Sequence, residues 1–170
     1  MFNEERGTNL WTPLYQGKIF DQGDVCTVPM RFPGQPSPLC KEGGDFSSSS
    51  GNLVTWEGAT SNTVVGNIDN NEWMTYSNID FGDSPQYSQI MIRYSKDGGT
   101  PSGKLEVKLG NGTVIGNFVN PSITGSWDTY VEAYISITVT DSIQGIHDVT
   151  FTALDTVQGF MNIDSWALVK

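Results

Sequence analysis

Residues 104–119, KLEVKLGNGTVIGNFV, decide the fold class of this chain. The first six of them alternate charged and apolar side chains, as in a strand that buries one face and exposes the other to water. Asn111-Gly112 then fits a type I′ turn between two antiparallel strands. The stretch therefore predicts a β-hairpin.

The same alternation recurs in short segments from about residue 53 to the last residue. Runs of glycine, asparagine and proline separate these segments, and none of useful length shows a helical period. Strands at this spacing predict an all-β protein, a two-sheet antiparallel β-sandwich of the jelly-roll type. The expected strands are Leu53–Trp56, Thr63–Ile68, Glu72–Phe81, Tyr87–Tyr94, Lys104–Leu109, Thr113–Val119, Trp127–Thr140, Ile146–Ala153 and Phe160–Val169.

The first part of the chain is rich in proline and has few alternating runs. We expect an irregular Pro-rich arm over residues 1–41, with short strands around Ile19–Phe20 and Val28–Phe32, and one sandwich domain over residues 42–170. Ser47–Ser50 is expected to form a turn or loop. The first residues lack the charged-then-apolar layout of a signal peptide, so secretion is inferred and not read from a leader.

The chain is acidic, with nineteen Asp and Glu against nine Lys and Arg and a formal net charge of −10. Nucleic acid and anionic membranes are bound by clustered Lys and Arg, and because the chain has no basic run we exclude both as partners. No apolar run approaches the roughly 20 residues of a membrane span. Neutral glycans and divalent cations stay compatible, and the alternative is that the charge only keeps a secreted protein soluble.

The two cysteines, Cys26 and Cys40, lie in a proline-rich stretch. They are too few for a zinc site and lack the CxxC spacing of redox motifs. A disulfide between them would contribute about 3 kcal/mol in the chain-entropy model. Two unrelated free thiols are the alternative.

Four segments carry a more specific pattern: GNIDNNEWMTY at 66–76, IRYS at 92–95, TGSWDTY at 124–130 and GFMNIDSW at 159–166. A fifth, GIHDV at 145–149, lies between the last two. In this order and spacing they resemble the family 6 carbohydrate-binding modules and the related families that share their jelly roll. The resemblance covers roughly residues 42–170. It implies a non-catalytic, lectin-like, secreted module that targets an appended glycoside hydrolase to a polysaccharide.

Sugar binding needs a flat aromatic ring for the apolar face of a pyranose and polar groups for its hydroxyls. Trp127 lies on a loop that enters a strand, where a core tryptophan is unusual and binding residues are common. Asn162 is a short amide in an apolar strand, and a buried amide needs partners. We predict both as ligand contacts. The alternatives are a tryptophan that covers the sandwich end and an asparagine bonded near a turn.

The resemblance implies further contacts from Glu57 and Thr60, which have the family's three-residue spacing. The family commonly has a second stacking aromatic directly after the glycine of the first motif, where this chain has Asn67. That face of the site is then missing unless neighbouring Trp56 supplies a ring.

Some of these modules also bind glycan across a sheet face, and Trp73 matches that platform. The alternative is an outward tryptophan that merely covers the sheet. Tyr76 lies three residues on and points to the opposite face, which favours the core for one of the two. Trp166 is expected in the core or covering a sheet.

The resemblance also implies a structural Ca²⁺ held by an acidic residue near each end of the module. Asp164 matches the second of these, and Glu42 or Asp45 is expected to supply the first. Carboxylates and backbone carbonyls are the hard oxygen ligands that Ca²⁺ prefers.

An enzyme is the less favoured interpretation. His147 is the only histidine and lies in a strand-like stretch, so no catalytic triad suggests itself. Paired carboxylates could hydrolyse glycosides, but acidic chains always offer such pairs. We predict a module that binds a neutral β-linked polysaccharide, xylan or a β-glucan. A small β-sandwich glycoside hydrolase or lyase and an adhesion or structural β-sandwich that contacts protein stay open as alternatives.

Overall fold

The structure, a computed structural model, describes residues 40–58, 63–100, 102–138 and 143–170. Within these ranges the secondary structure consists of strands, and no helix is present. The strands are β1 (Cys40–Glu42), β2 (Ser48–Ser49), β3 (Val54–Glu57), β4 (Thr63–Gly66), β5 (Trp73–Asp80), β6 (Gln89–Ser95), β7 (Lys104–Leu109), β8 (Val114–Val119), β9 (Val131–Ser136), β10 (Ile146–Leu154) and β11 (Asn162–Val169).

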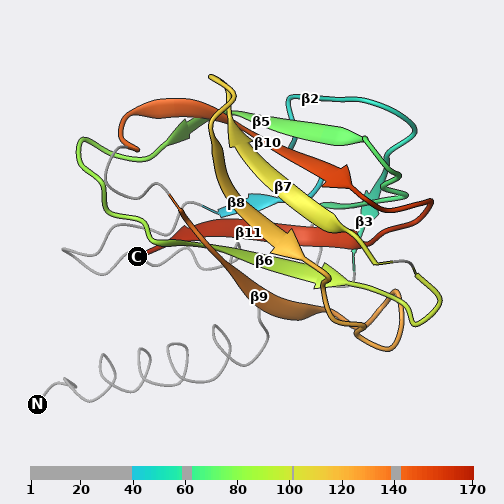
Figure 1. Ribbon diagram of the computed structural model, residues 1–170. Coiled ribbons are helices and arrows are strands. Elements are labelled where there is room, and N and C mark those ends of the chain that lie inside the picture. The colour runs from blue at the N-terminus through green and yellow to red at the C-terminus, as the bar shows by residue number, and fades with distance from the viewer. Residues whose placement is uncertain (1–39, 59–62, 101, 139–142) are drawn as a thin grey trace, which may run out of the picture.

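The strands form two antiparallel sheets that pack face to face (Figure 1). The first sheet has the order β3-β4-β11-β6-β9, with β1 also paired to β11. The second sheet has the order β2-β5-β10-β7-β8. This is the predicted two-sheet antiparallel sandwich of the jelly-roll type, and β11, the central strand of the first sheet, is buried from Asn162 to Leu168.

Each strand predicted from Leu53 onward is present, Lys104–Leu109 with the predicted bounds and the others with shifted ends, because alternation of apolar and polar residues marks a strand with one buried face. The largest shift concerns Trp127–Thr140, which the sequence predicts as one strand. β9 starts only at Val131, since residues 124–130 form a loop held by hydrogen bonds.

Two short strands are absent from the prediction. β1 begins at Cys40, inside the predicted arm, and β2 lies within Ser47–Ser50, which the sequence predicts as a turn or loop. β2 adds to the edge of β5 through backbone contacts, with the Ser50 N–H donating to the Trp73 carbonyl at 3.0 Å. A serine run has no apolar alternation, so such an edge strand leaves no signal. The rest of the predicted arm, including Ile19–Phe20 and Val28–Phe32, lies outside the described residues.

The turn of the β7–β8 hairpin differs from the predicted type I′ geometry, which needs positive φ at two successive central residues. Gly112 has a φ of 86°, but Asn111 does not lie in the positive-φ region. The Gly112 N–H donates to the Leu109 carbonyl at 2.8 Å, and Asn111 Oδ1 accepts from the Thr113 N–H at 3.0 Å. The type I′ prediction is therefore wrong, because the asparagine side chain stabilises a longer connection.

The core between the sheets centres on the rings of Tyr76, Phe151 and Trp166. These rings meet edge to face in pairs, with centroid separations of 5.6, 5.2 and 5.1 Å. Such pairs contribute about 0.5–1.5 kcal/mol beyond the area that they bury. Trp166 is in the core, as predicted, and Tyr76 points inward while Trp73 of the same strand is only half-buried.

The Tyr76 hydroxyl joins the second sheet to the segment that follows β1. It donates to the Gly43 carbonyl at 2.7 Å, and both residues are buried. Burial raises the pKa of the Tyr76 hydroxyl well above its ordinary value, and the Asp45 carboxylate acts in the same direction. The hydroxyl therefore stays a neutral donor at physiological pH.

We predict that Tyr76→Phe lowers the free energy of unfolding by about 1–2 kcal/mol, because the buried Gly43 carbonyl loses its donor. Urea unfolding measures the change. Tyr134→Phe is the matched control, since Tyr134 is 55% exposed. Equal stability of the Tyr76 variant and the wild type would show that the contact is not stabilising.

Candidate functional site

The predicted ligand contacts Trp127 and Asn162 lie together at one end of the first sheet. β6 ends at Ser95, and this residue pairs with Asn162, the first residue of β11. On the other side of β11, strand β4 ends at Gly66, beside the Asn162 amide. The ends of three neighbouring strands thus bring these residues to one place.

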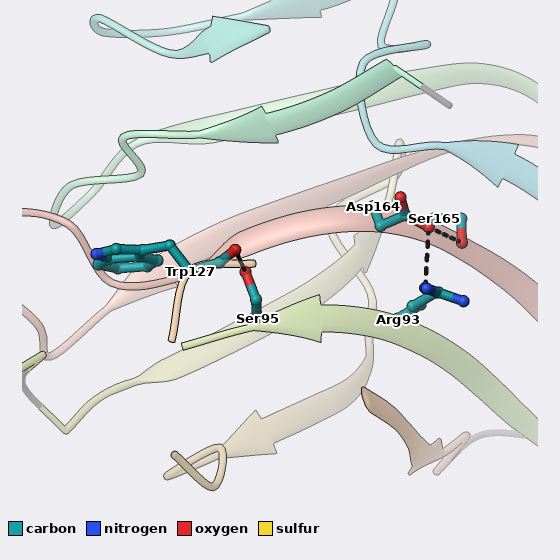
Figure 2. A network of polar contacts seen from close by, with 5 residues as sticks. All are labelled: Arg93, Ser95, Trp127, Asp164 and Ser165. Atoms are coloured by element: carbon teal, nitrogen blue, oxygen red, sulfur yellow. Dashed lines mark hydrogen bonds and ion pairs between the residues drawn. The ribbon is translucent and has the colours of Figure 1, made fainter. Parts of the chain in front are cut away.

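The backbone of Trp127 is fixed to the strand ends. Ser95 Oγ donates to the Trp127 carbonyl at 2.7 Å, and Asn162 Nδ2 donates to the same oxygen at 3.5 Å. Figure 2 shows the indole pointing away from Ser95. The side chain is partly exposed, so a ring on a fixed backbone is presented at the sandwich end.

Hydrogen bonds within and around the loop at 124–130 hold it in shape. Thr124 Oγ1 accepts from the Lys96 N–H at 2.9 Å and donates to the Lys96 carbonyl at 3.0 Å. Gly125 has a φ of 102°, which favours glycine, and the hydroxyls of Ser126 and Thr129 lie 2.9 Å apart. These contacts explain the residue types of the TGSWDTY segment around its tryptophan.

Tyr130 is the last residue of the loop at 124–130. Burial raises the pKa of its hydroxyl, and hydrogen bonds with the Ser95 and Asn162 side chains lower it in part. The Arg93 guanidinium lies over the Tyr130 ring, with 5.7 Å from Cζ to the ring centroid. Tyr130 therefore contacts both residues that hold the Trp127 carbonyl.

Trp56 reaches the same place from β3. A Cβ built on Gly66 would lie 2.6 Å from Trp56 Cη2 and 2.9 Å from Cζ3, and even closer to Asn162 Oδ1. Asn67, at the position of the family's second aromatic, is exposed and has a φ of 56°. Its Nδ2 donates to the Asn52 carbonyl at 3.0 Å.

The structure does not bring the other predicted contacts to this point. Glu57 is exposed at the end of β3, and alternation along the strand points it to the opposite face from Trp56. Thr60 lies outside the described residues. Trp73 lies on the second sheet, where its backbone N–H donates to Ser50 Oγ at 3.0 Å. Glu57, Thr60 and Trp73 stay predictions as ligand contacts.

The Asp164 carboxylate, a predicted calcium ligand, already has partners (Figure 2). Arg93 Nε lies 3.3 Å from Asp164 Oδ2, and Ser165 Oγ donates to the same oxygen at 3.1 Å. The Asp164 carbonyl accepts the Gly43 N–H at 2.7 Å. A guanidinium thus neutralises the carboxylate at the place where a cation is predicted.

The other predicted calcium ligands also have partners. Glu42 Oε2 accepts from the Thr63 N–H at 2.8 Å, and Asp45 Oδ2 accepts from the Glu42 N–H at 3.3 Å. In the part of the chain that the structure describes, no three acidic, histidine or cysteine side chains are grouped as a metal site. The calcium site therefore stays a prediction from sequence.

His147 and Glu72 have structural partners. His147 Nε2 lies 2.9 Å from the Gln144 carbonyl, and its ring packs on Phe81. Glu72 Oε1 and Oε2 accept the N–H groups of Asn52 and Asp69, both at 2.8 Å. These groups hold loops in place.

Cys40 is disulfide-bonded, and none of the described cysteines is free. Its predicted partner, Cys26, lies outside the described residues, so the pairing stays a prediction. None of the described residues forms a helix that is long and apolar enough to cross a membrane.

Sequence reasoning does not single out Ser95, Gly66, Tyr130 or Arg93, although all four lie within the quoted segments. Spacing identifies the segments, but only the pairing of β6, β11 and β4 shows that these side chains meet at Asn162.

A jelly-roll sandwich with a partly exposed indole and an amide at a loop end is the arrangement of a carbohydrate-binding module. The family profile described as Carbohydrate binding module (family 6) matches residues 43–170. The chain therefore belongs to family 6 of the carbohydrate-binding modules. It is a non-catalytic module that binds carbohydrate.

Similar proteins agree with this family. Endo-1,4-beta-xylanase A of Thermoclostridium stercorarium is 31% identical over 129 residues, which are 74% of this chain and 23% of the xylanase. CsCBM6-3 from Clostridium stercorarium, solved in complex with cellobiose, is 27% identical with a TM-score of 0.65, covering 78% of this chain and 93% of that one. A family 6 module from Clostridium cellulolyticum in complex with xylose is 25% identical with a TM-score of 0.67, covering 78% and 97%.

We predict that Ser95→Ala lowers the free energy of unfolding by about 1 kcal/mol, because the Trp127 carbonyl loses its shorter hydrogen bond. It is also expected to weaken oligosaccharide binding, since the indole is less firmly placed. Urea unfolding and calorimetric titration measure the two effects. Ser88→Ala, at an exposed serine that precedes the other end of β6, serves as the control. Unchanged stability and affinity in the Ser95 variant would contradict the prediction.

Proposed function

We propose that this module binds a neutral β-linked polysaccharide, xylan or a β-glucan, at the end of the first sheet. The observation that carries the proposal is the Trp127 indole, which points outward while Ser95 and Asn162 fix its carbonyl. A pyranose laid on the indole buries its apolar C–H face. Because the loop is ordered before binding, little conformational entropy is lost.

Asn162 supplies the polar group of the proposed site. Its Nδ2 donates to the Trp127 carbonyl, and its Oδ1 lies on the Gly66 side, next to the Trp56 ring. In this orientation Oδ1 can accept a hydrogen bond from a sugar hydroxyl. Glu57, Thr60 and Asn67 are the further polar contacts that the sequence predicts. Open sites of this kind give micromolar to millimolar affinity, about −4 to −8 kcal/mol.

Charge and relatives support the choice of ligand. A net charge of −10 disfavours polyanionic polysaccharides. The similar solved modules hold cellobiose and xylose, and the similar curated protein is a xylanase of which the chain spans 23%. These relatives support a neutral β-linked ligand, an appended glycoside hydrolase that the module targets to its substrate, and a secreted, lectin-like role.

We propose Trp73 as a second platform on the outer face of the second sheet. It pairs with Thr152 of β10, which in turn pairs with Glu106 of β7. The half-buried indole thus lies in a row with a hydroxyl and a carboxylate, which are groups that contact sugar hydroxyls.

We predict that Trp127→Ala abolishes detectable binding of xylohexaose and cellohexaose at the sheet end, because the stacking surface is removed. Isothermal titration calorimetry measures the loss, and circular dichroism checks the fold. Trp73→Ala is measured separately, so that binding at the second sheet is distinguished. An unchanged titration of a variant that lacks both Trp127 and Trp73 would overturn both proposed sites.

A structural Ca²⁺ stays a proposal that rests on the sequence pattern alone. We expect the melting temperature to rise by several degrees in millimolar Ca²⁺ relative to EDTA, because a ligand that binds only the folded state stabilises that state. Sugar binding is expected to persist in EDTA. If EDTA leaves melting unchanged, the metal proposal fails and Arg93 remains the partner of Asp164.

A further inference from the structure

We propose that Trp56 is a further ligand-contacting residue of the sugar site, and that Gly66 fixes the place of its ring. The inference rests on the proposed function, since it concerns the same end of the first sheet. The geometry of β3, β4 and β11 carries it.

Trp56 is not a core residue. It lies in β3, the edge strand of the first sheet, where all four residues are exposed, and 38% of its own surface meets solvent. A single exposed apolar residue is ordinary in a soluble protein. Trp56 differs from such residues in its position. It pairs with Val64 of β4, and its indole extends from there to Gly66, two residues further along that strand.

The contact at Gly66 depends on the absence of a side chain. A Cβ on this residue would lie 2.6 Å from Trp56 Cη2, a separation that real Cβ atoms do not show. The same Cβ would meet Asn162 Oδ1. The benzene ring of Trp56 and the amide oxygen of Asn162 therefore converge on the α-carbon of one glycine.

Asn162 therefore lies between the Trp56 ring and the backbone carbonyl of Trp127. Its Oδ1 is on the Gly66 and Trp56 side, and its Nδ2 donates to the Trp127 carbonyl on the other side. A sugar whose hydroxyl reaches Oδ1 while its ring stacks on Trp127 then comes next to the Trp56 ring. A second flat apolar surface beside the same hydroxyl adds contact area without another polar group.

Trp56 places an aromatic ring next to Gly66, and Asn67 does not. Its φ of 56° lies in the left-handed region, which bulky side chains seldom adopt, and its amide is held by the Asn52 carbonyl. The ring next to Gly66 thus comes from the neighbouring strand and not from the residue that follows the glycine in sequence.

The test compares Trp56→Ala, Trp56→Leu and Trp56→Phe by calorimetric titration with xylohexaose and cellohexaose. Leucine keeps an apolar side chain without a flat ring, and phenylalanine keeps an aromatic ring. We expect the alanine and leucine variants to lose about tenfold in affinity, equal to about 1.4 kcal/mol, and the phenylalanine variant to stay within about threefold of wild type. Tyr134→Ala, at another exposed aromatic of the first sheet, is expected to bind as wild type does.

A glycine pair tests the role of Gly66. Gly66→Ala is expected to weaken binding at least as much as Trp56→Ala, because its Cβ displaces both the indole and the Asn162 amide. Gly99→Ala is the matched control, since a Cβ there meets nothing within 4 Å. Proton NMR of the sugar gives a readout that a merely structural role would not change: the upfield shift of C–H protons over an aromatic ring decreases in Trp56→Leu.

The outcomes separate this inference from the proposed function. Wild-type affinity in Trp56→Leu together with lost binding in Trp127→Ala overturns the role of Trp56 and leaves the sugar site intact. No binding of either oligosaccharide by the wild-type chain overturns both. If the alanine variant fails to fold by circular dichroism, the leucine and phenylalanine pair decides.

Discussion

The carbonyl of Trp127 is the point on which the binding end of this module depends. Ser95 and Asn162, at the ends of two adjacent strands, both donate to it, and Tyr130 contacts both donors. A loop residue is thereby tied to the rigid part of the sandwich. The indole gains a fixed position without being packed into the core, which is the requirement for a ring that a ligand must reach.

A second constraint is the close approach of side-chain and backbone groups to glycine. At Gly66 the backbone admits the Trp56 indole and the Asn162 amide, and at Gly43 it admits the Ile163 carbonyl. Both glycines lie against the same central strand, one near the binding end and one where Tyr76 joins the sheets. The shape of the sheet end is thus determined by missing side chains as much as by the aromatic rings.

Much of the fold is predictable from the sequence because alternation directly reflects a strand with one buried face. The wrong predictions at β2 and at the turn at Asn111 have a common cause. Both elements depend on backbone and side-chain hydrogen bonds, which the hydrophobic pattern does not reveal. The order of the motifs in the sequence identifies Trp127 and Asn162 as candidate ligand contacts. It does not find Ser95 or the contact of Trp56 with Gly66, because these depend on which strands are neighbours. The pairing of Asp164 with Arg93 is likewise a property of the β6–β11 pair, which the motif alone does not reveal.

Two acidic side chains, Glu72 and Asp69, hold loops together near this end of the sandwich. Glu72 holds the N–H groups of Asn52 and Asp69, and Asp69 in turn accepts the Gly159 N–H at 2.9 Å. Each oxygen of the Glu72 carboxylate thus accepts one backbone N–H, so this side chain links two loops by charge-assisted hydrogen bonds. On these ordered loops and strand ends, the proposed sugar site combines the Trp127 and Trp56 rings with the amide of Asn162.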